Sequence, residues 1–249
     1  MTEEERSGRP PPPLGIRALQ RCPPVSGGHN RPVPEGLERE IKLSAGDGYV
    51  LPDLADLAPG GVDDSGVEPI LSAYWDTPSL ELVRQGCGLR HRLRLDRPED
   101  PGIWTLKTPG RTEGDRMVRG EHELIGPGTS PPPALLALVP ARVDAGALRP
   151  VAVLRSARRV LTLAGAAPEG HRRKSVEVMD DRVEVCSPDG PAVSRFRELE
   201  VEIQDGGDEL ADRVAARLRE AGAGPPESSS KYRRALEILG HQVGEIAGL

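Results

Sequence analysis

This sequence has few aromatic residues and no surplus of positive charge. Phe, Trp and Tyr together make up 2% of its 249 residues, so a hydrophobic core has to be built from Val, Leu, Ile and Ala. The formal net charge is -6 and the isoelectric point is near 5.5. General binders of nucleic acid or of membrane surfaces normally carry a basic excess, so the composition argues against both classes. Any anion-binding site must therefore be local.

Cysteine and long apolar runs are also scarce. The three cysteines, Cys22, Cys87 and Cys186, lie far apart, and none forms a C-x-x-C pair. This spacing argues against a disulfide framework or a zinc site and is typical of reduced thiols in a cytoplasmic protein. No apolar run approaches the roughly 20 residues of a membrane-spanning helix, and the proline-rich N-terminal segment lacks the apolar stretch of a signal peptide. We expect a soluble, cytoplasmic protein with no membrane partner.

The chain divides into a tail, one folded domain and a short end segment. Residues 1–36 are rich in Pro, Gly, Arg and Ser and have few side chains able to pack, which predicts disorder. Residues 37–240 form the predicted domain, and residues 241–249 form a C-terminal tail. Strands are predicted at residues 37–43, 67–75, 89–95, 103–108, 119–123, 151–163, 172–181, 182–186 and 198–203. Short helices are predicted at residues 52–57, 79–85, 131–139, 208–221 and 228–239.

Charged residues recur with a period of two along several of these strands. Because successive side chains of a strand point to opposite faces, each such strand has an ionic face and a largely apolar face. The ionic faces carry Glu38, Glu40 and Lys42; Arg90, Arg92 and Arg94; Arg119, Glu121 and Glu123; and Glu198, Glu200 and Glu202. An ordinary half-solvated antiparallel strand has the same alternation, but solvated faces usually mix their signs, and these strands segregate them.

Like charges in a row on one strand repel, since alternate side chains are only about 6.8 Å apart. The simplest arrangement that balances them is one shared site, lined by carboxylates on one side and by guanidinium and ammonium groups on the other. Such a site suits a polyanion that carries a divalent metal ion. The sequence therefore predicts an α+β fold in which an eight-stranded antiparallel sheet closes into a barrel, with a polar lumen and short helices packed outside.

The ordered set of motifs resembles the CYTH family of triphosphate tunnel metalloenzymes. The matching pieces are Glu38-x-Glu40-x-Lys42, Tyr74-Trp75-Asp76-Thr77, Leu89-Arg90-x-Arg92, Thr105-x-Lys107-x-Pro109, Arg119-x-Glu121-x-Glu123, Arg158, Asp181, Glu198-x-Glu200-x-Glu202 and Ser230-Lys231. They span residues 37 to about 240. The resemblance implies a tunnel-shaped barrel that acts on triphosphate compounds with Mg²⁺ or Mn²⁺.

The resemblance and the side-chain chemistry together suggest a role for each residue. Hard divalent ions take oxygen ligands, so the metal candidates are the carboxylates of Glu38, Glu40, Glu121, Glu123, Asp181, Glu198, Glu200 and Glu202. The phosphate-binding candidates are Arg90, Arg92, Lys107, Arg119, Arg158 and Lys231. Arg155 and Arg159 are alternatives to Arg158. The catalytic candidates are Lys42 and Glu200, where Lys42 either orders the attacking water or forms a salt bridge to Glu40 or Glu200.

These roles favour a metal-dependent triphosphatase that releases the terminal phosphate of its substrate. Inorganic tripolyphosphate is the first-choice substrate, because few aromatic residues are present to bind a base. A nucleoside or thiamine triphosphatase, an adenylate cyclase and a non-catalytic polyphosphate-binding module stay open as alternatives. Many bacterial members of the family carry a helical, histidine-rich CHAD domain after the CYTH domain. A CHAD-type domain or protein is therefore an expected partner, and the chain is either a stand-alone enzyme or one half of a longer protein.

Overall fold

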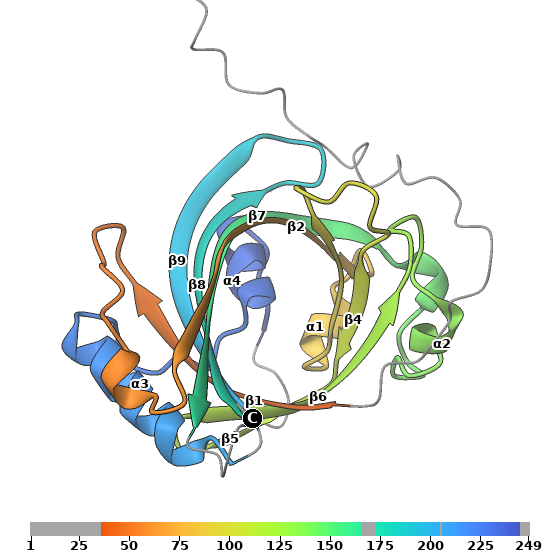
Figure 1. The fold of residues 1–249 in the computed structure, drawn as a ribbon. Helices are drawn as coiled ribbons and strands as arrows, with labels where there is room; N and C mark the ends of the chain where they lie inside the picture. Colours follow the sequence, from red (N-terminus) through yellow and green to blue (C-terminus); the bar gives the residue numbers. More distant parts are fainter. Residues whose placement is uncertain (1–35, 166–172, 205, 245–249) are drawn as a thin grey trace, which may run out of the picture.

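The computed structural model describes residues 36–165, 173–204 and 206–244, and within these ranges the strands join one antiparallel sheet (Figure 1). The strands are β1 (Gly36–Ala45), β2 (Val62–Asp76), β3 (Gly88–Arg94), β4 (Ile103–Lys107), β5 (Arg111–Glu113), β6 (Arg116–Ile125), β7 (Arg149–Gly165), β8 (Arg173–Cys186) and β9 (Ala192–Ile203). Their order is β1-β9-β8-β7-β2-β3-β4-β6-β5, and β1 also pairs with β6. This extra pairing closes the sheet into a barrel of eight strands and leaves β5 outside. The predicted eight-stranded closed barrel is confirmed.

The helices of the described ranges are short. They are α1 (Glu81–Arg84), α2 (Pro133–Leu136), α3 (Asp208–Glu220) and α4 (Lys231–Ile238), with 3₁₀ helices η3 (Ala55–Leu57) and η4 (Ala145–Ala147). The helices predicted at residues 52–57 and 131–139 shrink to η3 and α2, since prolines interrupt or border both segments. No helix in the described parts of the chain is both long enough and apolar enough to cross a bilayer.

Strand β1 lies between β9 and β6 and brings charged side chains of both neighbours next to its own. Lys42 stands opposite Glu200 on β9, and Glu38 stands opposite Arg119 on β6. Residues directly opposite in an antiparallel pair point to the same face, with Cβ atoms about 4.5–5.5 Å apart. At these two positions the pairing sets a cation against a carboxylate, whereas Glu40 on β1 stands opposite Glu202 on β9, so the balance is incomplete.

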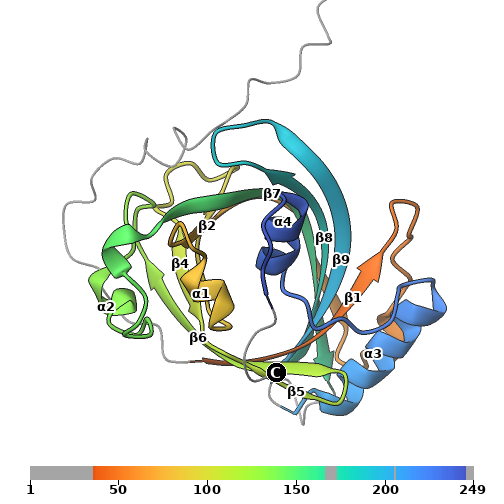
Figure 2. The ribbon, with the colours of Figure 1, turned by 180° about the vertical axis from the view of Figure 1, so that it is seen from behind.

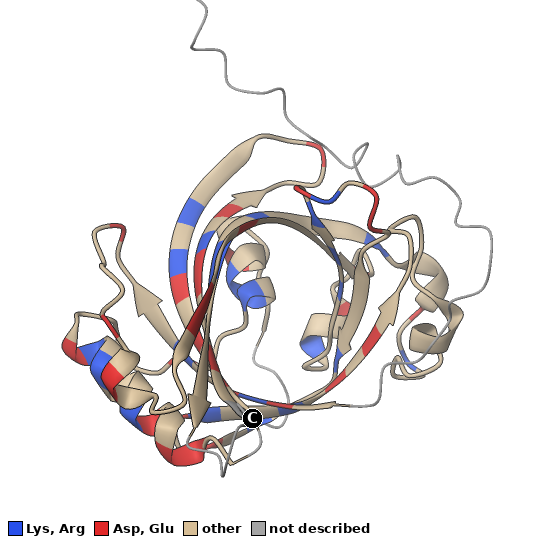
Figure 3. Ribbon diagram, viewed as in Figure 1, with Lys and Arg blue, Asp and Glu red and all other residues tan. Residues whose placement is uncertain are grey.

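The two faces of the barrel differ as the strand pattern predicts. On the outer face, Ile41 and Val201 belong to a buried cluster beneath η3 and α3, and Trp104 and Leu106 belong to a second cluster with Leu135 of α2. Many charged residues of the same strands point inward instead, and Figure 3 shows Lys, Arg, Asp and Glu as blue and red bands along the barrel strands. The polar lumen is confirmed, and α2 and α3 pack outside the barrel as predicted.

Helix α4 differs from that expectation, because it lies inside one end of the barrel (Figure 1 and Figure 2). Its Tyr232 packs in one cluster with Leu154 of β7 and Val183 of β8. Leu154 alternates in phase with Arg158, and Val183 with Asp181, so both apolar residues share the lumen face of their strands. The amphipathic pattern of α4 identifies a buried face, but that face packs against the interior of the barrel.

Some predictions fall outside the described residues. The tail predicted to be disordered, residues 1–36, lies outside them except for Gly36, the first residue of β1, and so do residues 245–249 of the predicted C-terminal tail. Cys22 also lies outside, whereas Cys87 and Cys186 are free and buried. The two strands predicted at residues 172–181 and 182–186 form one continuous strand, β8.

Candidate active site

Three buried carboxylates from two neighbouring strands meet in the lumen, and we call them the acidic trio. Asp181 comes from β8 and Glu198 and Glu200 come from β9, and one oxygen of each lies within 4.8 Å of the other two. In the parts of the chain that the structure describes, this is the one such group of His, Cys, Asp or Glu side chains. The ammonium of Lys231, the first residue of α4, lies 2.7 Å from Asp181, 2.6 Å from Glu198 and 2.9 Å from Glu200.

The charges of this cluster shift its pKa values in different directions. Burial alone would lower the pKa of Lys231, but the acidic trio outweighs burial and raises that pKa well above its ordinary value. Burial also favours the neutral form of Glu200, yet the surrounding cations, Lys231 first, hold its pKa well below the ordinary range. Glu198 behaves otherwise, because burial raises its pKa despite the nearby Lys231. Lys231 therefore stays charged, and Glu198 protonates more readily than Glu200.

Arg158 on β7 extends the cation set around the acidic trio. It donates from Nε and Nη2 to both oxygens of Asp181, at 2.8 and 2.6 Å, and from Nη2 to Glu200 at 3.3 Å. The register that places Arg158 opposite Asp181 settles which of two adjacent arginines faces the lumen. Arg159 points the other way and pairs with the exposed Asp64.

Lys42 on β1 bridges the acidic trio and the neighbouring carboxylate on its own strand. Its ammonium lies 3.3 Å from Glu200 and 3.4 Å from Glu40. Burial alone would lower the pKa of Lys42, but nearby carboxylates, Glu40 first, raise it above its ordinary value. Of the two roles expected for Lys42, the salt bridge is the one that the structure displays.

Glu38 and Glu40, both predicted metal ligands, are held by cations from other strands. Glu38 accepts hydrogen bonds from Lys107 Nζ at 2.5 Å and from Arg119 Nε at 2.7 Å, and Glu40 accepts one from Arg119 Nη2 at 3.0 Å. Burial favours the neutral form of Glu38, but Lys107 and Arg119 hold its pKa well below the ordinary value. Two predicted phosphate-binding cations are thus engaged by two predicted metal ligands.

Glu121 and Glu123 on β6 stand apart from the acidic trio. Glu121 forms ion pairs with Lys107 at 3.5 Å and with Arg90 at 3.7 Å, and Glu123 accepts a hydrogen bond from Thr105 Oγ1 at 3.0 Å. The structure therefore divides the predicted metal ligands into a compact group of three and a set of separate carboxylates on the surrounding wall of the lumen.

Glu202, the last of the predicted metal ligands, faces other acids. Burial, followed by the charges of Glu38 and Glu177, raises the pKa of Glu202 to about 7. Its side chain accepts a hydrogen bond from Gln204 Nε2 at 3.0 Å. Near neutral pH this carboxyl is therefore only partly ionised.

Arg90 and Arg92 on β3 have weaker anionic contacts than the lumen cations described above. Arg92 makes no hydrogen bond or ion pair with any residue in the described part of the chain. Burial, followed by the charges of Arg90 and Arg158, lowers the pKa of Arg92 to about 10. The buried Nε of Arg90 has no hydrogen-bond partner within the described ranges, and its ion pair with Glu121 is long at 3.7 Å. Since buried charges are normally paired, these two guanidinium groups mark a place for a negative charge.

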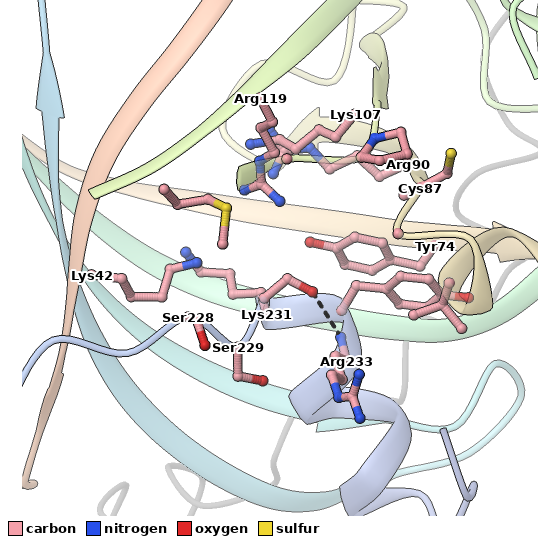
Figure 4. Close-up of a pocket in the computed structure, with 18 of the residues that line it drawn as sticks. Lys42, Tyr74, Cys87, Arg90, Lys107, Arg119, Ser228, Ser229, Lys231 and Arg233 are labelled. Atoms are coloured by element: carbon pink, nitrogen blue, oxygen red, sulfur yellow. Dashed lines mark hydrogen bonds between the residues drawn. The ribbon is translucent and has the colours of Figure 1, made fainter. Parts of the chain in front are cut away.

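Two cavities open into the lumen from opposite ends of the strands. The first, which we call the mouth cavity, has a volume of about 210 Å³, and its lining includes Lys42, Tyr74, Arg90, Lys107, Arg119, Ser228, Ser229 and Lys231. In Figure 4, Arg90, Lys107 and Arg119 gather on one side of it and Lys42 and Lys231 on the other. The second, of about 670 Å³, has a lining that includes Glu68, Arg92, Arg94, Arg158, Glu177 and Glu202. Arg90 and Arg92, neighbours on one face of β3, therefore line adjoining stretches of the lumen.

Sequence reasoning missed the contacts that fix α4 at the mouth cavity. Tyr232 Oη donates to Asp76 Oδ2 at 2.8 Å, and the Tyr232 ring stacks on Tyr74 with 4.7 Å between centroids. Asp76 also accepts hydrogen bonds from the backbone N–H groups of Leu82 and Val83 in α1. The sequence signals a helix start after Asp76, but a partner 156 positions later leaves no local pattern.

The acidic trio fits a divalent cation in donor type and in spacing. Carboxylate oxygens are the ligands that Mg²⁺ and Mn²⁺ prefer, and the trio offers three of them within 4.8 Å of one another. The ammonium of Lys231 at this place is independent support, because it demonstrates that the trio stabilises a positive charge.

Known proteins with similar sequences extend these observations. The model of the CYTH domain matches residues 37–236. The uncharacterized proteins MT2285 and Rv2226, from two strains of Mycobacterium tuberculosis, are each 32% identical to this chain over 215 residues, which is 80% of this chain and 40% of each relative. The chain thus spans about 40% of the length of these curated relatives.

Solved structures share the fold. PH1819 from Pyrococcus horikoshii OT3 superposes with a TM-score of 0.51 at 20% identity, over 80% of this chain and 98% of that one. HpAC1 from Hippeastrum, described as a candidate adenylyl cyclase with a dominant triphosphatase activity, has a TM-score of 0.50 at 16% identity, over 82% of this chain and 97% of that one. At these identities the likeness concerns the fold alone, but the family match covers most of the sequence. The chain belongs to the CYTH domain family.

Proposed function

We propose that this protein is a divalent-metal-dependent triphosphatase that releases the terminal phosphate of inorganic tripolyphosphate. The observation that carries the proposal is Arg92, which has no hydrogen bond or ion pair within the described residues and lies near Arg90 and near Arg158, a partner of the acidic trio. A multiply charged anion would supply negative charge beside Arg90 and Arg92, and the acidic trio fits a cation. The two components of a metal–triphosphate complex thus have matching sites in one lumen.

The reaction needs little covalent chemistry from the protein, because phosphoryl transfer depends on charge neutralisation and positioning. Arg90 and Arg92 would hold phosphate oxygens through bidentate, charge-assisted hydrogen bonds. Lys107 and Arg119 line the same cavity as Arg90 and would exchange Glu38 for phosphate. The phosphate chain would then lie between these cations and the acidic trio.

The acidic trio would hold the divalent ion, which when bound supplies positive charge to the phosphate oxygens and polarises water. Lys42 lines the mouth cavity and lies 3.3 Å from Glu200. Its ammonium is therefore in position to orient a water or a phosphate oxygen beside the trio. Glu200 touches Lys42, Arg158 and Lys231, so it would set the positions of all three cations.

The burial of the aromatic residues favours a substrate that has no nucleobase or other ring. Trp104 is fully buried in the outer cluster that also contains Trp75. Tyr74 lines the mouth cavity but is stacked on Tyr232 and only 6% exposed. Little aromatic surface is left to stack on a purine or a thiazolium ring. This favours tripolyphosphate over nucleoside and thiamine triphosphates and over a cyclase reaction.

HpAC1 has a dominant triphosphatase activity, which agrees with the hydrolase proposal for this chain. Incubation of the protein with tripolyphosphate, ATP or thiamine triphosphate, each with Mg²⁺ or Mn²⁺, followed by product identification, tests it. Orthophosphate release with preference for tripolyphosphate is expected. Cyclic AMP from ATP would support the cyclase instead, and tight binding without any product would support a polyphosphate-binding module. The CHAD-type partner domain or protein stays a prediction.

A variant of the acidic trio tests the metal assignment. Glu200→Gln should lose hydrolysis by at least about 100-fold, because the neutral amide weakens both the cation site and the hold on Lys42. It should still bind tripolyphosphate, since the arginines of β3 are unchanged. Glu184→Gln is the matched control, because Glu184 lies on β8 and pairs with the exposed Arg195. Normal turnover by Glu200→Gln would contradict the assignment.

A further inference from the structure

Lys231 occupies the place where the proposed function requires a metal ion. Its ammonium lies between 2.6 and 2.9 Å from all three members of the acidic trio. We propose that Lys231 is an internal counter-cation, which closes the trio to divalent ions until its side chain turns into the mouth cavity and contacts the phosphate chain. This inference rests on the proposed function, because it assigns Lys231 two successive partners within the same site.

The ammonium and a divalent ion cannot share the trio. Divalent ions bind carboxylate oxygens at roughly 2.0–2.6 Å, and the three oxygens available lie within 4.8 Å of one another. A cation held by all three would therefore take the space in which the ammonium of Lys231 now lies. Like charges in such a small, buried space repel strongly, so the entry of one requires the exit of the other.

The side chain of Lys231 can leave without movement of its helix. Tyr232 holds α4 through its hydrogen bond to Asp76, and Ser230 caps the helix by accepting a hydrogen bond from the backbone N–H of Arg233. Lys231 is the first residue of α4, and its flexible four-carbon stem is not part of either contact. Since Lys231 also lines the mouth cavity, rotation of its side chain would carry the ammonium from the acidic trio into that cavity.

The exchange couples the two ligands of the reaction. When a divalent ion binds the acidic trio, the ammonium of Lys231 moves into the mouth cavity, where its positive charge adds to those of Arg90, Lys107 and Arg119. A phosphate chain in that cavity in turn attracts the ammonium away from the trio. By linkage, each ligand then raises the affinity for the other by the same factor. The protein would bind neither ion nor phosphate tightly without the other.

Mn²⁺ binding to the full chain without phosphate tests the inference directly. Isothermal titration with Mn²⁺ should give at least tenfold tighter binding for Lys231→Met than for wild type, because the competing ammonium is gone. Arg233→Met is the matched control: Arg233 lies on the same helix and also lines the mouth cavity, but it pairs with Glu237. It should bind Mn²⁺ as wild type does. Equal or weaker Mn²⁺ binding by Lys231→Met would overturn the proposal.

A second measurement covers the case in which Lys231→Met folds poorly. Lys231→Arg keeps the positive charge and should keep wild-type Mn²⁺ affinity. In thermal melts, Mn²⁺ should raise the melting temperature of Lys231→Met more than that of wild type or Lys231→Arg. A rise equal in all three would overturn the proposal. Tripolyphosphate should also strengthen Mn²⁺ binding to wild type more than to Lys231→Met. Absence of hydrolysis by wild type would remove the proposed function but would leave the Mn²⁺ competition to be decided by these titrations.

Discussion

Arg92 allows a test in which stability and binding move in opposite directions. Arg92→Met keeps most of the apolar stem and removes a half-buried charge that has no hydrogen bond or ion pair within the described residues. We expect the variant to melt at a higher temperature than wild type and to bind tripolyphosphate more weakly. A structural arginine would behave differently, because its removal lowers stability.

The size of both effects follows from the surroundings of Arg92. Burial, with the charges of Arg90 and Arg158, lowers its pKa from the ordinary arginine value to about 10, which corresponds to up to about 3 kcal/mol at about 1.36 kcal/mol per pKa unit. This destabilisation of the folded state applies wherever the guanidinium is charged in both states, that is, below about pH 10. Its relief should raise the melting temperature by several degrees, at about 2–4 °C per kcal/mol. Loss of a charge-assisted contact of about 1.5–3 kcal/mol should weaken binding roughly 10- to 100-fold.

Differential scanning calorimetry at neutral pH and titration with tripolyphosphate would measure the two quantities. Arg158→Met is the matched control, because Arg158 faces the same lumen but makes two short hydrogen bonds to the buried Asp181. Its removal leaves a buried carboxylate short of a partner and should lower the free energy of unfolding by about 3–5 kcal/mol. The assignment of Arg92 to an anion site would be refuted if Arg92→Met melted at a lower temperature than wild type. It would also be refuted if Arg92→Met bound tripolyphosphate as tightly as wild type.

Three further predictions concern stability. Burial, followed by the charges of Glu38 and Glu177, raises the pKa of Glu202 from 4.5 to about 7. Folding therefore takes up a proton between these pH values, and the free energy of unfolding falls as the pH rises through this window. In denaturant titrations, Glu202→Gln should remove up to about 3 kcal/mol of that loss near pH 8 and little near pH 4. Mn²⁺ at about 100 times its Kd should stabilise the protein by about 2.7 kcal/mol, and an unchanged melting temperature after EDTA treatment of the metal-loaded protein would contradict a metal site. Tyr232→Phe should lower the free energy of unfolding by about 1–3 kcal/mol in chemical denaturation, because the buried Asp76 loses a hydrogen bond; an unchanged midpoint would show that this bond does not fix α4.

The barrel and its ionic lumen could be predicted from the sequence because each depends on a local pattern. Period-two alternation places Glu198 and Glu200 on one face of β9 whatever the rest of the chain does. Their repulsion then demands cations from other strands, and closure of the sheet is the arrangement that supplies them. Family resemblance added the order of the motifs, and the family match over residues 37–236 bears it out.

The partners of each charge could not be predicted, since they depend on contacts between distant residues. Glu38 and Arg119 are 81 positions apart, and only the register of β1 on β6 brings them together. The choice of Arg158 over Arg159 likewise follows from the register of β7 on β8. An amphipathic helix pattern shows that one face of α4 is buried but not which surface buries it. The contact of Lys231 with the acidic trio depends on which surface buries α4, and the sequence pattern does not identify that surface.

The lumen is therefore better understood as a network of exchangeable ion pairs than as a set of vacant ligand positions. Most of its cations already have a carboxylate within 4 Å, and Lys231 holds the acidic trio, whereas Arg92 has no such partner in the described ranges. A triphosphate would compete with Glu38 for Lys107 and Arg119, and a divalent ion would compete with Lys231. Because each ligand displaces an internal charge of its own sign, the net gain from binding either one alone is small. Binding of both together gives the ammonium of Lys231 a phosphate partner when the divalent ion displaces it from the acidic trio, so selectivity for a metal–triphosphate complex over either component is expected of this arrangement.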